Sequence, residues 1–168
     1  MKAFLFALML VPVVSFAQAD SKDRKIDPTE VKSDGKLVFV HAAKTKTQPA
    51  VRKEGDKRKL KDDEIYVGDV TFHIGGNDLK ADSAIMYTND GVLSMYNFSI
   101  TNPVSFTFKG DNLIFTKETV KAVLQSGIKI TTLNGDVVGT SDNMEMDFGY
   151  EIGKVIGGSI TPPDPEKK

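Results

Sequence analysis

The stretch ADSAIMYTNDGV (residues 81–92) contains the unit that decides the fold. A small residue and an aspartate precede a short apolar strand, which a polar turn joins to a longer alternating strand. Asn-Asp-Gly between two alternating runs is typical of a β-hairpin, because Asn, Asp and Gly tolerate positive φ. The unit therefore predicts two antiparallel strands and no helix.

The same unit begins again at Gly110-Asp111 and at Ser141-Asp142, with a spacing of about 30 residues. Repetition at about 20–50 residues marks stacked arrays, in which one unit cannot bury its own apolar face and needs its neighbours. The longer strands of the three units are expected over residues 92–100, 120–130 and 152–160. The repeat predicts an all-β array of stacked antiparallel strands in the manner of a β-solenoid.

Other segments extend this array. Leu37–His41 and Ile65–Ile74 alternate as strands do, with Val70, Phe72 and Ile74 on one face. Residues 75–78 (GGND) predict a turn, and residues 44–61 are the least strand-like portion of the chain. The C-terminal TPPDPEKK (161–168) cannot join a central strand, since proline lacks the N–H donor.

Composition limits the class of protein. The chain has 168 residues, which suits one domain with tails, and a formal net charge of −1. That balance argues against a nucleic-acid binder, because no overall basic field attracts phosphate. Cysteine is absent, so a thiolate metal site and a cysteine nucleophile are excluded.

The N-terminal segment resembles a targeting sequence. Lys2 supplies the positive end, residues 3–16 the apolar stretch, and Ala17-Gln18-Ala19 an A-x-A cleavage site. We expect residues 1–19 to be a cleaved signal peptide of an exported protein; the alternative is retention as a membrane anchor. A flexible lead-in is expected over residues 20–36, the β-domain over residues 37–160, and a disordered tail over residues 161–168.

The region from Tyr66 to Pro162 resembles the OstA-like family of periplasmic lipopolysaccharide-transport proteins. The residues that carry the resemblance succeed one another in order: VGDVTF (67–72), LKADSA (79–84), the turn from Tyr87 to Gly91, FKGD (108–111) and GTSD (139–142). The chain departs from the pattern after Ala42-Ala43, where the aspartate is missing, and through a basic insertion at residues 44–63.

The resemblance implies a twisted, open β-jellyroll that carries lipopolysaccharide toward the outer membrane and is not an enzyme. It implies acyl chains of lipid A in an apolar interior, and exposed terminal strands that join jellyroll domains of inner- and outer-membrane transport components or further copies head to tail. The location implied is periplasmic. The alternative function is a β-solenoid scaffold or interaction module without a lipid ligand. A third alternative, a carbohydrate-cleaving enzyme on a β-solenoid frame, would need carboxylates or basic side chains converging on one groove.

Eight aromatic and methionine side chains are candidates for the lipid-binding apolar groove: Phe72, Phe98, Phe106, Phe108, Phe115, Met144, Met146 and Phe148. Unbranched methionine adapts to varied apolar partners, which favours such a role. The alternative is that these side chains only fill the core of a small β-protein.

Three further groups of polar residues are candidate sites. Asp82, Asp111 and Asp142 would stack as a ladder; a calcium site is one interpretation, and a local turn hydrogen bond at each strand start is the favoured one. The basic cluster within residues 52–61 would suit lipid A phosphates or an anionic membrane, or be a solvated loop. His41 and His73 lie on separate predicted strands, so neither a metal nor a cofactor is expected.

Overall fold

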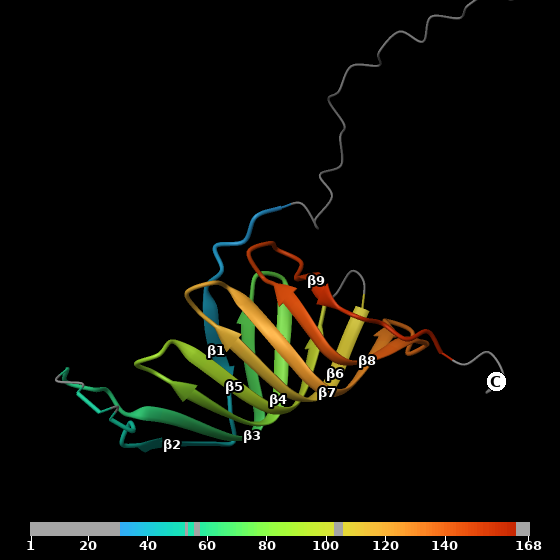
Figure 1. Cartoon of the computed structure of the whole chain (residues 1–168). Coiled ribbons are helices and arrows are strands. Elements are labelled where there is room, and N and C mark those ends of the chain that lie inside the picture. Colours follow the sequence, from blue (N-terminus) through green and yellow to red (C-terminus); the bar gives the residue numbers. More distant parts are fainter. Residues whose placement is uncertain (1–30, 53, 56–57, 103–105, 164–168) are drawn as a thin grey trace, which may run out of the picture.

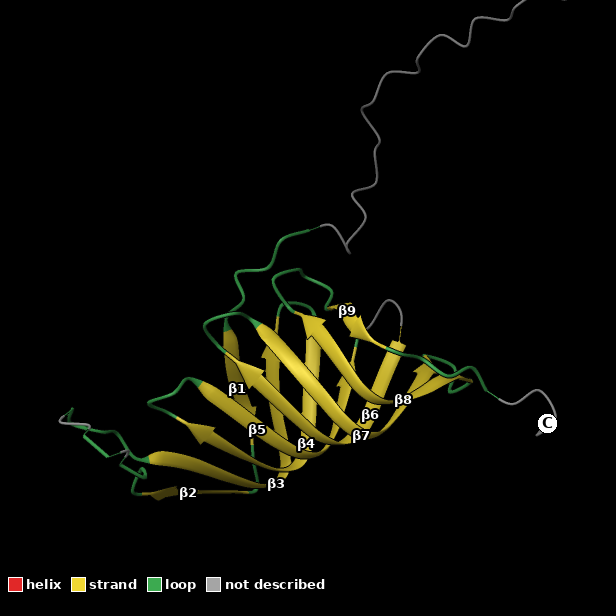
Figure 2. Ribbon diagram, viewed as in Figure 1, coloured by secondary structure: helices red, strands yellow, loops and turns green. Residues whose placement is uncertain are grey.

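The computed structural model describes residues 31–52, 54–55, 58–102 and 106–163, and these residues form β-structure without a helix (Figure 1). The prediction of an all-β, open and twisted array of antiparallel strands is confirmed (Figure 2). The strands are β1 (Leu37–His41), β2 (Lys44–Gln48), β3 (Asp63–Ile74), β4 (Asn77–Tyr87), β5 (Val92–Thr101), β6 (Phe106–Thr116), β7 (Lys121–Thr132), β8 (Val137–Asp147) and β9 (Lys154–Gly158). Within the described part of the chain, no helix is long and apolar enough to cross a membrane.

All nine strands belong to one antiparallel sheet, in the order β1-β3-β4-β5-β6-β7-β8-β9. β1 pairs with the C-terminal half of β3, and β2 pairs with its N-terminal half. The path does not close on itself. Its two ends are therefore β1 with β2 on one side and β9 on the other.

A corner crosses the middle of the long strands and divides the sheet into two arms. On β3, β5 and β7 the corner is made with left-handed backbone at Asp69 (φ 48°), Asn97 (φ 51°) and Ser126 (φ 63°). The β3–β4 and β7–β8 pairings shift register at these positions, as β-bulges do. Since a bulge bends its strand and strengthens the local twist, the sheet folds over on itself here (Figure 1).

The corner also changes which residues of a strand face inward. On β4, Leu79 and Ala81 are buried before the corner, whereas Ala84 and Met86 are buried after it. Strict alternation would have buried residue 83 instead. Because two successive residues face away from the core at the corner, both arms keep their apolar faces toward one another.

The repeated aspartates mark this corner, which corrects the expectation that they begin strands. Asp82, Asp111 and Asp142 lie in the middle of β4, β6 and β8, and all three are exposed. In one repeat the small residue before the aspartate is required for steric reasons. At Gly110 an added Cβ would lie 2.9 Å from the Phe98 ring. The repeat therefore specifies a bend in the sheet and not a strand start.

Other predicted boundaries differ from the structure as well. The turn expected over residues 75–78 is shorter, because Asn77 already begins β4, and the strand expected over residues 152–160 is only Lys154–Gly158. β2 occupies a segment that was expected to be least strand-like. Its sequence, KTKTQ, is exposed on both faces, so it shows no apolar alternation, yet threonine favours strands and lysine suits an unprotected edge.

The predicted tails fall largely outside the described residues. Residues 1–19, the expected signal peptide, and residues 164–168 are among those not described. Residues 31–33 of the expected lead-in do have defined partners, since Lys32 forms an isolated β-bridge with Tyr150.

Candidate functional site

Seven of the eight candidate side chains lie in one continuous apolar core between the two arms. Phe72, Phe98, Phe108, Phe115, Met144, Met146 and Phe148 are each at most 7% exposed. Phe106 differs, with 38% exposure at the start of β6. The interior of the folded sheet is thus lined by the residues that the sequence singled out, and most of it is filled by their side chains.

Three neighbouring strands contribute to the centre of this core. Phe115 on β6, Ala122 on β7 and Met146 on β8 are aligned in register across the sheet, and all three are buried. The ring of Phe148 packs edge-on against that of Phe115, with centroids 6.1 Å apart. The ends of β6 and β8 therefore contribute to a single apolar cluster.

An aromatic cluster lies at the end of the sheet where the chain begins. The Phe39 ring is centred 4.7 Å from that of Tyr66 and 5.5 Å from that of Phe72. Phe39 is 43% exposed, whereas Tyr66 and Phe72 are buried. The sequence predicts that Phe39 lies on a strand, but it does not predict that the ring lies beside the interior. The only available signal was the alternation of residues that the segment of Phe39 shares with β3.

Tyr66 keeps its phenol neutral in this cluster. Its hydroxyl donates a hydrogen bond to the carboxylate of Glu64 on the same strand. Burial, together with that hydrogen bond and the negative charge of Glu64, raises the pKa of Tyr66 well above its usual range. The polar tip thus has a partner while the ring remains part of the apolar interior.

An apolar cavity of about 250 Å³ opens between the arms at the opposite end, near β9. It is bounded by apolar groups from both arms and by two asparagines: Ile100, Phe106, Phe108, Met146, Ile152, Gly153, Val155, Asn77 and Asn102. Three of the eight candidate residues meet here. Exposed apolar side chains stand at this cavity, because Phe106 and Val155 are 38% and 42% exposed.

A buried amide network holds the β8–β9 loop across this end of the interior. The Asn77 amide donates to the carbonyls of Ile74 and Glu151, at 3.0 Å each. Its oxygen accepts hydrogen bonds from the Asn102 amide (3.0 Å) and the Gly153 N–H (3.2 Å). Asn77 is 1% exposed and Asn102 is 3% exposed, so this network ties the tips of one arm to the loop that ends the other. We call these four hydrogen bonds the amide clasp.

The segment that enters the fold at residues 31–33 adds a second tie to the same loop. The Ser33 N–H donates to the Gly149 carbonyl (3.1 Å), and the Glu151 N–H donates to the Val31 carbonyl (2.8 Å). The Gly76 N–H donates to the Glu151 carbonyl as well (2.7 Å). The loop is therefore held from two sides.

Two lysines flank Tyr150 on this loop. The Nζ atom of Lys32 lies 3.8 Å, and that of Lys154 3.9 Å, from the centre of the Tyr150 ring. A hydrogen bond from Lys32, together with the charges of Lys32 and Lys154, lowers the pKa of the Tyr150 phenol. Two positive charges from residues far apart in the sequence thus lie beside the Tyr150 ring.

The segment with the predicted basic cluster contacts the β4–β5 turn. The Lys61 N–H donates to the Asn89 side chain (3.0 Å), and the Asn89 amide donates to the Lys61 carbonyl (2.7 Å). Lys53 and Lys57 lie outside the described residues, so a phosphate-binding role for the whole cluster stays a prediction.

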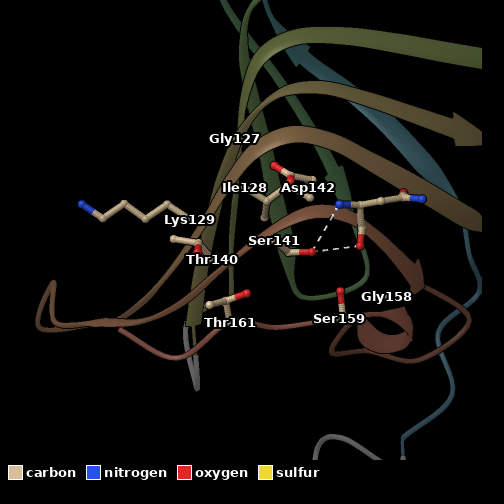
Figure 3. A pocket seen from close by; sticks show the side chains of 10 residues that line it. Gly127, Ile128, Lys129, Thr140, Ser141, Asp142, Gly158, Ser159 and Thr161 are labelled. Atoms are coloured by element: carbon tan, nitrogen blue, oxygen red, sulfur yellow. Dashed lines mark hydrogen bonds between the residues drawn. The ribbon is translucent and has the colours of Figure 1, made fainter. Parts of the chain in front are cut away.

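A polar hollow of about 670 Å³ lies outside the corner, between β7, β8 and the residues that follow β9 (Figure 3). Lys129, Thr140, Asp142 and Thr161 are among its lining residues. The Ser141 hydroxyl turns to its own strand, donating to the Asn143 carbonyl (2.9 Å) and accepting from its N–H (3.2 Å), so it is part of the corner itself.

The aspartate ladder is likewise part of the corner. The Asp82 carboxylate accepts a hydrogen bond from the side chain of Asn97 on β5 (2.9 Å), which replaces the local turn bond that was expected. Among the described residues, no group of three or more His, Asp or Glu side chains is placed to hold a metal ion. The hydrogen bond joins the outward residues of two neighbouring strands where they bend.

No protein-family profile matches the chain. No curated protein sequence matches it significantly. Among solved structures, the chain is similar to the crystal structure of LptH from Pseudomonas aeruginosa, described as the LptA homologous periplasmic component of the lipopolysaccharide transport device. The TM-score is 0.48 and the sequence identity 14%, over 77% of this chain and 90% of that chain.

Proposed function

We propose that this protein is an OstA-like, non-enzymatic lipopolysaccharide carrier or bridge of the periplasm. The observation that carries the proposal is the apolar interior between two arms of an open sheet, with a cavity between Phe108 and Met146 at one end. Acyl chains of lipid A would lie among the eight candidate residues, and sugars and phosphates would stay in water. Such separation follows from the cost of moving sugar hydroxyls or phosphates into an apolar interior.

Lipid entry requires the interior to widen. The cavity of about 250 Å³ is below the roughly 300–1,000 Å³ of typical ligand pockets. Seven of the candidate side chains already pack against one another. We infer that the arms move apart as acyl chains enter, a movement that an unclosed sheet allows because no strand joins its two ends.

The same open ends support the proposed partners. β9 ends the path of the sheet, and Val155 and Ile156 on it are 42% and 46% exposed. A row of unpaired N–H and C=O groups accepts a further strand by β-augmentation. Jellyroll domains of inner- and outer-membrane transport components, or a second copy of the chain, would pair at these edges.

A second candidate function is a scaffold or interaction module that binds no lipid. The filled core favours it, since side chains that already satisfy one another need no ligand.

Native mass spectrometry of the protein with and without lipopolysaccharide separates the two functions. The carrier predicts an adduct of defined stoichiometry that weakens when Met146 is replaced by Glu and persists when the exposed Glu118 is replaced by Gln. Absence of an adduct at every lipopolysaccharide concentration would leave the scaffold as the function.

A further inference from the structure

The outer face of one arm of the sheet carries apolar side chains. This arm runs from β2 through the N-terminal half of β3 to the C-terminal half of β8, and we call it the β2 arm. Ile85, Ile114 and Val123 each lie between two buried neighbours on their strands, so their side chains point away from the core. The solvated face of an antiparallel sheet is ordinarily polar, so these residues depart from the usual pattern.

The register of the strands aligns the outward residues of the β2 arm in one row. From β2 to β8 the row is Lys46, Ile65, Ile85, Ser94, Ile114, Val123 and Glu145. Val67 and Tyr96, both exposed, extend the apolar surface into the next row toward the corner. We define the outer apolar face as Ile65, Val67, Ile85, Tyr96, Ile114 and Val123.

The outward residues of the other arm have the opposite character. One row there consists of Thr71, Lys80, Ser99, Lys109 and Lys129. Both rows belong to the same strands, so the apolar character is specific to the β2 arm. Since contiguous apolar patches on a protein surface mark sites of interaction, the outer apolar face is expected to be covered by a partner.

The row on the β2 arm is complementary to its own reverse. Ser94 on β5 is its centre, aliphatic residues lie on both sides of Ser94, and Lys46 and Glu145 end the row with opposite charges. A two-fold axis along β5, in the plane of contact, places the row of one copy against the reversed row of another. Aliphatic side chains then meet aliphatic side chains, and Lys46 faces the second copy's Glu145. An isologous dimer requires self-complementarity of this kind.

The charges at the two ends favour a second copy over an anionic membrane as the partner. Lys46 suits anionic lipids, but Glu145 at the far end of the row would be repelled by them. Glu145 forms an ion pair with Lys121 (3.6 Å), yet its side chain is 46% exposed. A carboxylate has two acceptor oxygens, so Glu145 can bind a second cation from another copy.

We propose that two copies of this chain pack face to face through the outer apolar face, with β5 of each copy along the two-fold axis. Sheets that pack in this way lie about 10 Å apart, with strand directions within about 30° of each other. The contact lies on neither the edges nor the interior of the sheet, so it goes beyond the proposed function and is compatible with both a carrier and a scaffold.

The size of the face sets the expected strength of the dimer. Strands lie about 4.8 Å apart, so the row from β2 to β8 and the adjoining row cover roughly 500 Å² in each copy. A total of about 1,000 Å² is near the lower limit for a specific interface. We therefore expect a dissociation constant of about 100 µM, well above the concentrations at which edge pairing is followed.

Crosslinking with a short bismaleimide at about 100 µM protein tests the proposal near the expected dissociation constant. The chain contains no cysteine, so a single introduced cysteine reports on one position. Ser94→Cys lies on the proposed axis, and Ser99→Cys is the matched control. Both serines are half-buried on the outer face of β5, one on each arm. Labelling with N-ethylmaleimide corrects for any difference in the reactivity of the two thiols.

The expected result is at least about tenfold more covalent dimer from Ser94→Cys than from Ser99→Cys, with no larger species. Adding Ile114→Asp to Ser94→Cys should lower the yield at least about tenfold, because an unpaired carboxylate would be buried in the contact. Thr107→Asp, on the outer face of the same strand in the other arm, should leave the yield unchanged.

Charge reversal tests the two-fold arrangement itself. In the Ser94→Cys chain, Lys46→Glu and Glu145→Lys each place like charges opposite one another and should lower the yield. A mixture of these two variants should restore the yield, because each charge then meets its opposite in the mixed dimer.

Equal yields from the two cysteine positions, or a yield that Ile114→Asp leaves unchanged, would overturn the proposal. Failure of the mixture to restore the yield would overturn the arrangement that places Lys46 opposite Glu145. These results would leave the lipopolysaccharide carrier intact, since native mass spectrometry with lipopolysaccharide tests the interior and not the outer face.

Discussion

Replacing Asn77 with Ala should release the β8–β9 loop from the other arm. The substitution removes all four hydrogen bonds of the amide clasp, whose lengths are 3.0, 3.0, 3.0 and 3.2 Å. A hydrogen bond contributes about 1 kcal/mol net, and a buried group left without its partner costs about 1–3 kcal/mol. The Asn102 amide and the Gly153 N–H lose this acceptor, so we expect unfolding to become about 3–4 kcal/mol more favourable.

Urea denaturation followed by circular dichroism measures this change, with Asn134→Ala as the control. Asn134 is an exposed turn residue, and its substitution should alter the free energy of unfolding by no more than about 0.5 kcal/mol. Hydrogen exchange adds a local readout, since the Gly76 and Gly153 amides should lose protection in Asn77→Ala. A loss of less than about 1 kcal/mol with both amides still protected would refute the clasp as the tie between the arms.

Further expectations concern the corner, the loop and the edge of the sheet. Gly110→Ala places a Cβ 2.9 Å from an aromatic ring and should lower the free energy of unfolding, measured by urea denaturation, by about 1–3 kcal/mol. The control is Gly157→Ala, whose added Cβ lies 3.4 Å from the nearest atom and should lower it by less than about 1 kcal/mol. Equal losses for the two variants would contradict the steric account. Tyr150 should be the first tyrosine to ionise as ultraviolet absorbance is followed with rising pH, because its pKa is lowered, and Tyr150→Phe should remove that first step; an unchanged curve would disprove the assignment. Because the pKa of Tyr150 is lower in the folded than in the unfolded state, its ionisation stabilises the folded protein at pH values above the pKa of the unfolded tyrosine. At pH values below the lowered pKa this contribution is absent. Proline at both Val155 and Ile156 removes N–H donors from β9 and should convert a concentration-dependent series in sedimentation to a monomer with an unchanged β-spectrum; an unmodified protein that stays monomeric and joins no jellyroll partner would contradict edge pairing.

The sheet and its interior could be predicted because a period of two is written in each long strand. Phe72, Phe115 and Met146 lie where alternation places them, and the Asn-Asp-Gly turn joins β4 to β5 as expected. The lengths of β4, β6 and β8 were underestimated. Alternation breaks where two successive residues face outward, so a strand that crosses the corner resembles two shorter segments separated by a small residue and an aspartate.

Features that depend on distant contacts left no signal in the sequence. Asn77 meets Glu151 and Gly153 across 74 and 76 residues, and nothing local to any of them predicts the contact. Lys32 and Lys154 are unremarkable in their own segments, and only the fold brings both to the Tyr150 ring. Phe106 follows the aromatic pattern but lies at the start of its strand, so the interior does not cover it.

Site-specific photo-crosslinking tests the central claim, that lipopolysaccharide binds within the folded sheet. Phe106 and Val155 line the cavity and are 38% and 42% exposed, so both positions tolerate a bulky photoreactive side chain. Ile114 is the matched control, because it lies on the outer face of β6 with 37% exposure. The account predicts capture of lipopolysaccharide from positions 106 and 155 and little from position 114. Equal capture from all three positions would mean adsorption to the surface and would contradict an apolar lipid-binding interior.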